Sequence, residues 1–497
     1  MTTSQQTFSI SPRHQGYFAL ALWGVIALLL LRHDVFGLDE GAARALLVSW
    51  SIADQVASSV FHTGMPDLRT LVYLPASYLW SGNVFAAKGL SALMLAIAAW
   101  LLYGWKNRAA GPEAALLPTG LLLISPLALQ QIDTLGVGVF LLMAFALGGW
   151  LDVRFRANPR PFNGWFFAQL GLCAFSVSLH PAGLAYPLAL AWSARSGPLE
   201  AKYRRYFLGG IALVALFFLV PKYLLSMRLL WNDLAWFHGH FKSLGSVFSG
   251  TLPEETGAMQ WLPGACVLAA TGAVVFLRGR ALWSDLTGRT LLLGLLLGAL
   301  VGDQAWAMIA LSIVLYFGLP MLLRSEQDTP NRGFMRQRGW VLGLVFIGAT
   351  LFMLGDKAYF AQGRSGTLSA QDQVIKAVVV AAESDRAARD AEDSDKKRPM
   401  FIVASEWPGR TMLACKCNTL PLPPVARDAQ GQPDPQAQLA KLRGVTYLLL
   451  DPKQTANIDL ARNLALLGGA IETASLQPGG VLLHVREEPA PKADGKK

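Results

Sequence analysis

The chain has 497 residues, of which 53% are hydrophobic and 15% are charged, and its net charge at pH 7 is +10. Soluble domains carry about 25% charged residues, so this composition excludes an ordinary soluble protein and indicates a membrane protein. The excess of lysine and arginine lies between apolar runs, where it sets the orientation of loops. The positive charge is therefore not a sign of nucleic-acid binding.

Eleven apolar runs predict transmembrane helices, because a spanning helix needs about 20 predominantly apolar residues. They are residues 17–31, 84–105, 113–129, 135–151, 162–180, 182–194, 206–221, 261–277, 290–302, 305–323 and 339–355. No small-residue cleavage site follows the first run, so we expect a retained helix rather than a cleaved signal peptide. The runs 182–194 and 290–302 are short for full crossings, and Pro187 would kink the former.

The connections between these runs alternate in charge. One set contains sixteen lysine and arginine residues, in the loops that follow residues 105, 151, 194, 277 and 323. The short connections near 130–134, 181 and 303 contain none. Basic loops stay in the cytoplasm, so we expect a cytoplasmic N-terminus in a bacterial inner membrane. An odd number of spans then places the C-terminus in the periplasm.

The predicted architecture has two parts. Residues 1–360 form an all-α polytopic membrane domain with long outer loops at 32–83 and 222–260, and residues 361–497 form a small periplasmic α/β domain. In the first outer loop, apolar residues from Ala43 to Val60 recur at helical spacing. This pattern predicts a helix that lies in the membrane interface or packs on the bundle.

The C-terminal part has the composition of a soluble domain. We expect a charged helix at about 370–392, a linker rich in Pro, Gln and Asp at about 419–437, and a second helix near 455–467. Runs of β-forming residues predict four strands. These runs are Met400–Ala404, Val445–Leu450, Ile471–Leu476 and Val481–Val485.

The four cysteines fall into two groups. Cys173 and Cys266 lie in apolar runs, where we expect them to pack. Cys415 and Cys417 are spaced poorly for a structural zinc site, which needs two separated pairs. A disulfide across one intervening residue would be strained, so free thiols and an unusual redox pair both stay open.

Ionisable residues at the ends of the runs gather on the predicted outer side. Asp39 and Glu40 follow the first run, Lys88 opens the second, and Asp133 and His180 lie at the ends of later runs. Charge inside a bilayer is costly, so its position indicates function. We expect these side chains to share one pocket under the outer loops.

The order of these residues resembles the GT-C glycosyltransferases. The similarity is greatest to bacterial relatives of the protein O-mannosyltransferases (glycosyltransferase family 39) and to the lipid A aminoarabinose transferase. That family has an Asp-Glu pair in the first outer loop before an alanine-rich helix, as in Leu38–Leu46 here. The other matching segments are Met65–Pro75, Phe85–Leu93, Ser125–Leu135 and Leu179–Leu184. Lys88 stands where the family usually has arginine, and His180 where it often has lysine.

The resemblance implies a GT-C-like fold and a membrane enzyme that uses a polyprenyl-phosphate-linked sugar as donor. The sugar passes, with inversion of the anomeric carbon, to a periplasmic acceptor, which is a protein, lipid A or an envelope glycan. Asp39 is then the catalytic base or its close partner, and Glu40 helps it through orientation or metal binding. Asp133 is a second carboxylate that positions the substrate or shares a divalent cation. The implied substrate-binding residues are Lys88, His180, Arg69, Tyr73 and His238. Any divalent cation, Mg or Mn, would be shared by Asp39 and Asp133.

Each of these residues also has a structural interpretation. Asp133 could cap a helix, His180 could fill a turn before Pro181, and Lys88 could extend to the membrane interface. His238 and His240 form a His-x-His pair, but we favour an aromatic loop there over a metal site.

Two other functions are compatible with the sequence. A transporter or lipid flippase needs ionisable groups near mid-membrane, and the predicted spans have none there. A non-catalytic envelope assembly protein would have the same membrane fold but no catalytic activity. In that case joint replacement of Asp39, Glu40 and Asp133 would have no effect.

Overall fold

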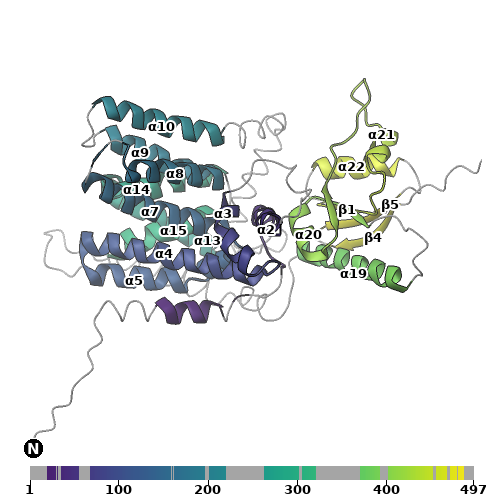
Figure 1. Ribbon diagram of the computed structural model, residues 1–497, viewed down its shortest axis with the longest axis horizontal. Coiled ribbons are helices and arrows are strands. Elements are labelled where there is room, and N and C mark those ends of the chain that lie inside the picture. Colours follow the sequence, from purple (N-terminus) through teal and green to yellow (C-terminus); the bar gives the residue numbers. More distant parts are fainter. Residues whose placement is uncertain are drawn as a thin grey trace, which may run out of the picture. The chain divides into compact units, whose positions relative to one another are not determined.

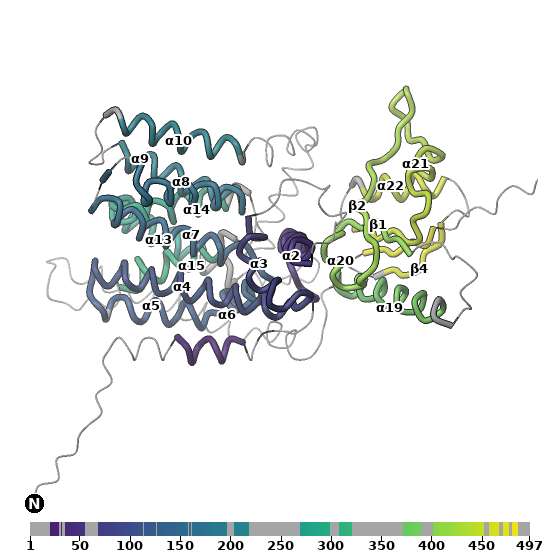
Figure 2. The backbone as a smooth tube through the Cα atoms, viewed as in Figure 1, coloured from purple at the N-terminus to yellow at the C-terminus, as the bar shows by residue number. Residues whose placement is uncertain are grey.

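The computed structural model of the protein describes most of the chain, and Figure 2 colours these residues along the backbone. They are residues 20–28, 31, 35–54, 68–157, 159–160, 162–195, 201–219, 262–301, 305–320, 370–391, 401–451, 455–466, 471–477 and 480–485. The chain forms two compact units. The helical unit comprises Met1–Arg32, Asp67–Val72 and Phe85–Gly363, and the mixed unit comprises His33–Pro66, Tyr73–Val84 and Arg364–Lys497.

The helical unit is built from apolar helices that follow the predicted runs (Figure 1). The helices are α4 (Val84–Ala110), α5 (Pro112–Ile124), α6 (Pro126–Asp133), α7 (Val137–Ala157), α8 (Gly164–Leu179), α9 (Ala185–Arg195), α10 (Ala201–Leu219), α13 (Leu262–Ser284), α14 (Leu286–Val301) and α15 (Ala305–Ile313). Helix α7 packs against α8, α14 and α15. It is buried on nearly every side, as expected for a helix that is apolar all round.

A proline starts a new helix inside the run 113–129, and another does so just before the run 182–194. The run 113–129 divides into α5 and α6, which meet at a bend of 49°. Ser125 is extended and caps α6, accepting a hydrogen bond from the Ala128 N–H at 3.1 Å. The run 182–194 begins with a short 3-10 helix, η2 (Pro181–Leu184). In both places proline disfavours helical geometry in the residue before it, so a new helix starts at the proline.

Two helices in the described part of the chain, α4 and α7, are long and apolar enough to cross a membrane. A third span is present if α5 and α6 count as one bent crossing. The prediction of eleven spans is therefore not confirmed. The run 339–355 and the outer loop 222–260 lie outside the described residues, as do residues 17–19 and 29–30 of the run 17–31.

The mixed unit contains a five-stranded sheet in the order β2-β1-β3-β5-β4. The strands are β1 (Ile402–Ser405), β2 (Asn418–Pro421), β3 (Tyr447–Leu450), β4 (Ile471–Gln477) and β5 (Gly480–Val485). Strand β1 pairs in parallel with β2 and β3, whereas β5 pairs antiparallel with β3 and β4. Its helices are α2 (Glu40–Ala53), α19 (Ala370–Ala391), α20 (Pro408–Cys415), α21 (Pro435–Lys441) and α22 (Thr455–Ala465), and α3 (Arg69–Leu79) contributes its second half.

Helices cover both faces of this sheet, because successive side chains of a strand point to opposite faces (Figure 1). Val403, Leu449 and Leu482 pack on one face with α19 and α20. Leu448 and Leu483 pack on the other face with α22. The result is a layered α/β fold with two apolar cores.

The predicted secondary structure of the C-terminal part is largely confirmed. Helices α19 and α22 and strands β1, β3, β4 and β5 lie where the sequence predicted them. Strand β2 and helices α20 and α21 were not predicted. Strand β2 lies at the sheet edge, where Pro421 is tolerated because no ladder donor is needed.

Cys415 and Cys417 form a disulfide, against the expectation that a bridge across one residue would be disfavoured. The reason is the backbone of Lys416, which ends α20 in the left-handed conformation at φ 52° and ψ 37°. That turn folds the chain back on itself and brings the Cys417 N–H to 3.2 Å from the Cys415 sulfur. Free Cys173 is buried in α8, as predicted.

Candidate functional site

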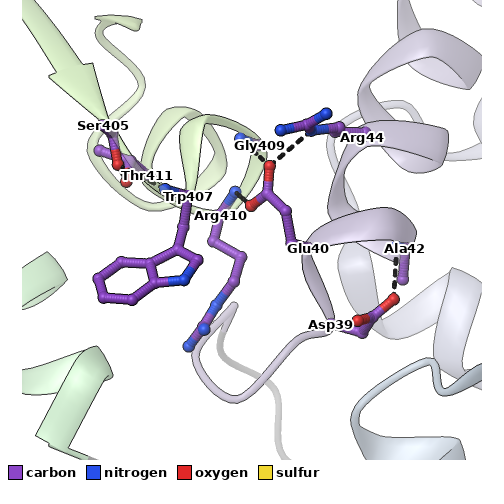
Figure 3. A network of polar contacts seen from close by, with 9 residues as sticks. All are labelled: Asp39, Glu40, Ala42, Arg44, Ser405, Trp407, Gly409, Arg410 and Thr411. Carbon is purple, nitrogen blue, oxygen red and sulfur yellow. Dashed lines mark hydrogen bonds and ion pairs between the residues drawn. The ribbon is translucent and has the colours of Figure 1, made fainter. Parts of the chain in front are cut away.

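The acidic pair lies at the start of α2, and its two members do different things (Figure 3). Asp39 is the N-cap of α2: its Oδ2 accepts a hydrogen bond from the Ala42 N–H at 3.1 Å. Short polar side chains are preferred at this position because they satisfy a helix N–H that has no other partner. The face of α2 that carries Ala43, Leu46 and Leu47 is buried in the protein.

Glu40 points away from Asp39 toward α20 (Figure 3). Its Oε1 accepts from the Gly409 N–H at 2.8 Å and its Oε2 from the Arg410 N–H at 3.0 Å. The Arg44 Nε also donates to Oε1 at 2.7 Å. Both carboxylate oxygens of Glu40 are therefore engaged at the positive end of a helix dipole.

Lys88 and Asp133 form an ion pair in the helical unit. The Lys88 Nζ lies 2.8 Å from Asp133 Oδ1, and the two side chains are 0% and 15% exposed. Removing a lysine ammonium from water costs several kcal/mol, and a carboxylate at hydrogen-bonding distance offsets much of that cost. Lys88 therefore does not extend to a membrane surface, which was one interpretation of the sequence.

The helix dipoles do not explain this ion pair. Lys88 lies just over one turn from the N-terminus of α4, where a cation is disfavoured, and Asp133 is the last residue of α6, where an anion is disfavoured. Asp133 is also not the N-cap of a helix, contrary to its structural interpretation. Both helix dipoles oppose these charges, so the pair is held by the attraction between its own members.

The turn that follows Asp133 is held by its own polar contacts. The Gln131 Oε1 accepts from the Gly138 N–H at 3.2 Å, at the start of α7, and Leu135 adopts a φ of 55°. Buried Arg69 donates from Nη1 to the Leu135 carbonyl at 3.4 Å. Arg69, predicted to bind substrate, thus supports the turn that carries Asp133.

His180 is buried and is the N-cap of η2. This contact agrees with the interpretation of His180 as a turn residue. Its Nδ1 accepts from the Ala182 N–H at 3.1 Å. Because Nδ1 accepts this hydrogen bond, the ring proton is on Nε2.

The other two predicted substrate-binding residues are placed as follows. Tyr73 lies in α3, and its side chain is fully buried. His238 lies outside the described residues. Asp39 and Asp133 belong to different units, so the shared pocket predicted for them stays a prediction.

The described residues do not fit a metal ion. Among them, no group of three or more His, Cys, Asp or Glu side chains could hold one. In addition, the Lys88 ammonium occupies the Oδ1 of Asp133, where a cation would repel it. We therefore derive no chemical step that uses a metal.

Sequence reasoning missed three residues of these arrangements: Gly409, Arg410 and Gln131. One signal for the first two was present. Pro408 begins α20, but Trp407 at its N-cap position provides no capping side chain. A helix start without a local cap indicates that its N–H groups find a partner elsewhere in the chain.

Comparison with known proteins gives relatives in structure only. No protein-family model and no curated protein sequence matches the chain. ArnT from Cupriavidus metallidurans in the apo state is 14% identical, with 94% of this chain and 98% of that chain covered and a TM-score of 0.50. The same ArnT bound to undecaprenyl phosphate is 14% identical over 95% and 97% of the two chains, with a TM-score of 0.47.

The oligosaccharyltransferase of Archaeoglobus fulgidus, tethered to an acceptor peptide containing the NVT sequon, is a more distant match. It is 13% identical over 88% of this chain and 69% of its own, with a TM-score of 0.47. At these identities the similarity concerns the fold. The chain thus has the fold of ArnT, which is the GT-C-like fold that the resemblance in sequence implied.

Proposed function

We propose that the protein is a membrane glycosyltransferase. It takes a sugar from a polyprenyl-phosphate donor and passes it to a periplasmic acceptor, with the N-terminus in the cytoplasm and the C-terminal part in the periplasm. The observation that carries this proposal is the buried Lys88–Asp133 ion pair. The ArnT structures, one of which contains undecaprenyl phosphate, support the choice of donor class.

The chemistry explains the residue types. The bond between the anomeric carbon and the phosphate oxygen breaks, and the acceptor oxygen or nitrogen bonds to that carbon with inversion. Asp39 takes the proton of the acceptor, and the leaving phosphate keeps the electron pair. Lys88 balances the charge that develops on the phosphate, because its ammonium carries a full positive charge.

Asp133 holds the ammonium in place before the donor arrives. Arg69 supports the turn that carries this carboxylate. His180 binds the same donor lipid. Preorganised charges of this kind stabilise a transition state without the cost of rearranging water.

The distribution of charge disfavours a transporter. In the described helices of the helical unit, every Asp, Glu, Lys and Arg lies within two turns of a helix end. Ion-coupled transporters place such groups near the middle of broken helices. No observation favours the assembly-protein alternative.

Mass spectrometry of envelope glycans, lipid A and surface proteins tests the function, with and without this gene. A sugar that disappears with the gene and returns with the wild-type chain identifies both sugar and acceptor. An unchanged envelope, together with uptake or lipid flipping by the purified protein in liposomes, would refute the proposal.

Asp39→Asn tests the proposed base. Asparagine caps helices as well as aspartate does, so α2 should stay folded. The initial rate of glycan formation after induction should fall by about 10²- to 10⁴-fold, as for loss of a general base. A wild-type rate in this variant would remove Asp39 from the mechanism.

A further inference from the structure

The contact between Glu40 and α20 joins parts of the chain that are far apart in sequence. Gly409 and Arg410 lie 369 and 370 residues after Glu40. Their N–H groups are in the first turn of α20, which has no capping side chain of its own. The Glu40 carboxylate therefore acts as the N-terminal cap of a helix in another part of the mixed unit.

The two helices leave little room for a side chain at position 409 while Glu40 and Arg44 are in place. A Cβ atom there would lie 2.9 Å from Arg44 Cγ, 3.0 Å from Glu40 Oε1 and 3.1 Å from the Arg44 backbone nitrogen. Real Cβ atoms do not approach other atoms within 3.0 Å. Glycine at this position thus allows the first turn of α2 to pack against the start of α20.

Helix α20 is itself fixed within the mixed unit. The Arg410 guanidinium donates to Asp372 at 2.6 Å and to Gln371 at 3.0 Å, both in the first turn of α19. Ser405 at the end of β1 contacts Thr411 at 2.8 Å (Figure 3). At the other end of α20, the Cys415–Cys417 disulfide closes the turn, and Arg386 donates to the Cys415 carbonyl.

Asp39 shares the first turn of α2 with Glu40. Its carboxylate is held by the Ala42 N–H, and its backbone carbonyl accepts from the Ala43 N–H at 2.9 Å. A shift of α2 relative to α20 would therefore carry Asp39 with it. Both oxygens of Glu40 are already engaged, so Glu40 is poorly suited to accept a proton from substrate.

We propose that Glu40 is a positioning residue through which the C-terminal part of the chain sets the location of Asp39. This inference rests on the proposed function, because it assigns the C-terminal part a role in the same sugar transfer. Misplacing a reacting group by about 1 Å can lower a rate by about 10²-fold. Glu40→Ala should therefore lower the initial rate of glycan formation by about 10²-fold in a strain lacking the native gene.

The affinity for donor lipid separates positioning from binding. Purified Glu40→Ala protein should bind undecaprenyl phosphate within about twofold of wild type, because Lys88 and Asp133 are unchanged. Glu40→Gln, which keeps one acceptor oxygen, should lose less activity than Glu40→Ala. Glu383→Gln, at an exposed position on α19, is the matched control and should behave as wild type.

Gly409→Ala tests the contact without changing any charge. Its added methyl group should push α2 from α20 and lower the rate in the same direction as Glu40→Ala. Gly171→Ala in α8 is its control, because a Cβ there meets nothing within 4 Å. A wild-type rate for both Glu40→Ala and Gly409→Ala would overturn the proposal.

A reversible cross-link provides the decisive test. In the pair Arg44→Cys and Gly409→Cys, the Cβ atoms should fall within the roughly 4.5 Å reach of a disulfide, because a Cβ at 409 lies 2.9 Å from Arg44 Cγ. The bond should form on oxidation and be found by peptide mass spectrometry. In the Glu40→Ala background, this disulfide should restore the rate to within about tenfold of wild type. Reduction of the disulfide should abolish the rescue. Wild-type protein treated with the same reductant is the control.

The outcomes are separable. Failure of the cross-link to form, or a cross-link that forms and does not restore the rate, overturns the positioning role of Glu40. A fully active Asp39→Asn variant refutes the proposed base instead, and the cross-link still reports on the contact between α2 and α20.

Discussion

The two ends of α4 place buried charge in opposite ways. At one end, Lys88 near the helix N-terminus pairs with Asp133 at the C-terminus of α6. At the other end, Trp105 donates from Nε1 to Asp285 Oδ2 at 3.2 Å, and Asp285 Oδ1 accepts from the Gly288 N–H at 2.7 Å. Asp285 thus precedes α14 as a capping residue and lies at the helix end that favours an anion.

Four of the arginines at the Asp285 end follow the same rule. Arg108, Arg154, Arg156 and Arg195 lie in the last turns of α4, α7 and α9, where the helix dipole favours a cation. Asp152 near the end of α7 and Arg289 in the first turn of α14 do not follow this rule, and Asp152 pairs with the more exposed Arg156 at 2.8 Å. At the Lys88 end both partners of an ion pair oppose their helix dipoles and the lysine side chain is fully buried, and this combination makes Lys88 and Asp133 a candidate site.

The single variant Lys88→Met should show the largest effect. It leaves the Asp133 carboxylate without its ammonium partner, which should lower the free energy of unfolding by about 3 kcal/mol. Glycan formation should also fall by at least about 10²-fold. Thermal unfolding of the purified protein in detergent and the glycan assay measure both.

Lys106→Met is the matched control, at the far end of the same helix. Lys106 lies over the rings of Trp105 and Phe317 at 5.7 and 5.1 Å, contacts worth about 1 kcal/mol or less at an accessible site. If Lys88→Met were as stable and as active as Lys106→Met, the proposed difference between the two ends of α4 would be wrong.

The double variant Lys88→Met with Asp133→Leu should separate stability from function. Replacing a buried ion pair by apolar residues is often neutral for folding, so the free energy of unfolding should return to within about 1 kcal/mol of wild type. Transfer and binding of undecaprenyl phosphate should stay lost. If transfer returned with stability, the ion pair would serve the fold alone.

Asp285→Ala should show the smallest effect, and only on stability. Loss of the cap and of the Trp105 hydrogen bond should cost about 1 to 2 kcal/mol in thermal unfolding. Asp285→Asn keeps an acceptor for the cap but loses the hydrogen bond from Trp105, so it should cost about 1 kcal/mol. Reduced transfer by folded Asp285→Asn would show that this end, too, takes part in function.

Prediction from the sequence was most accurate where the signal is local. The charged helix at 370–392 and four of the five strands were found from periodicity and composition, because each pattern is contained in a few neighbouring residues. The break at Ser125 and Pro126 was missed because an uninterrupted apolar run hides a change of direction. The disulfide was judged unfavourable because the left-handed Lys416 is not visible in the spacing of two cysteines.

The sequence by itself determined which segments are apolar, which ends carry charge and which residue types stand at the candidate site. Only the tertiary structure decided how those charges are used. It pairs Lys88 with Asp133 across 45 residues, and it turns Glu40 toward α20 across 369 while its neighbour Asp39 caps α2. The physical reason is that burial and periodicity depend on residues close together in the sequence. The partner of a buried charge depends instead on which helix ends meet when the chain folds.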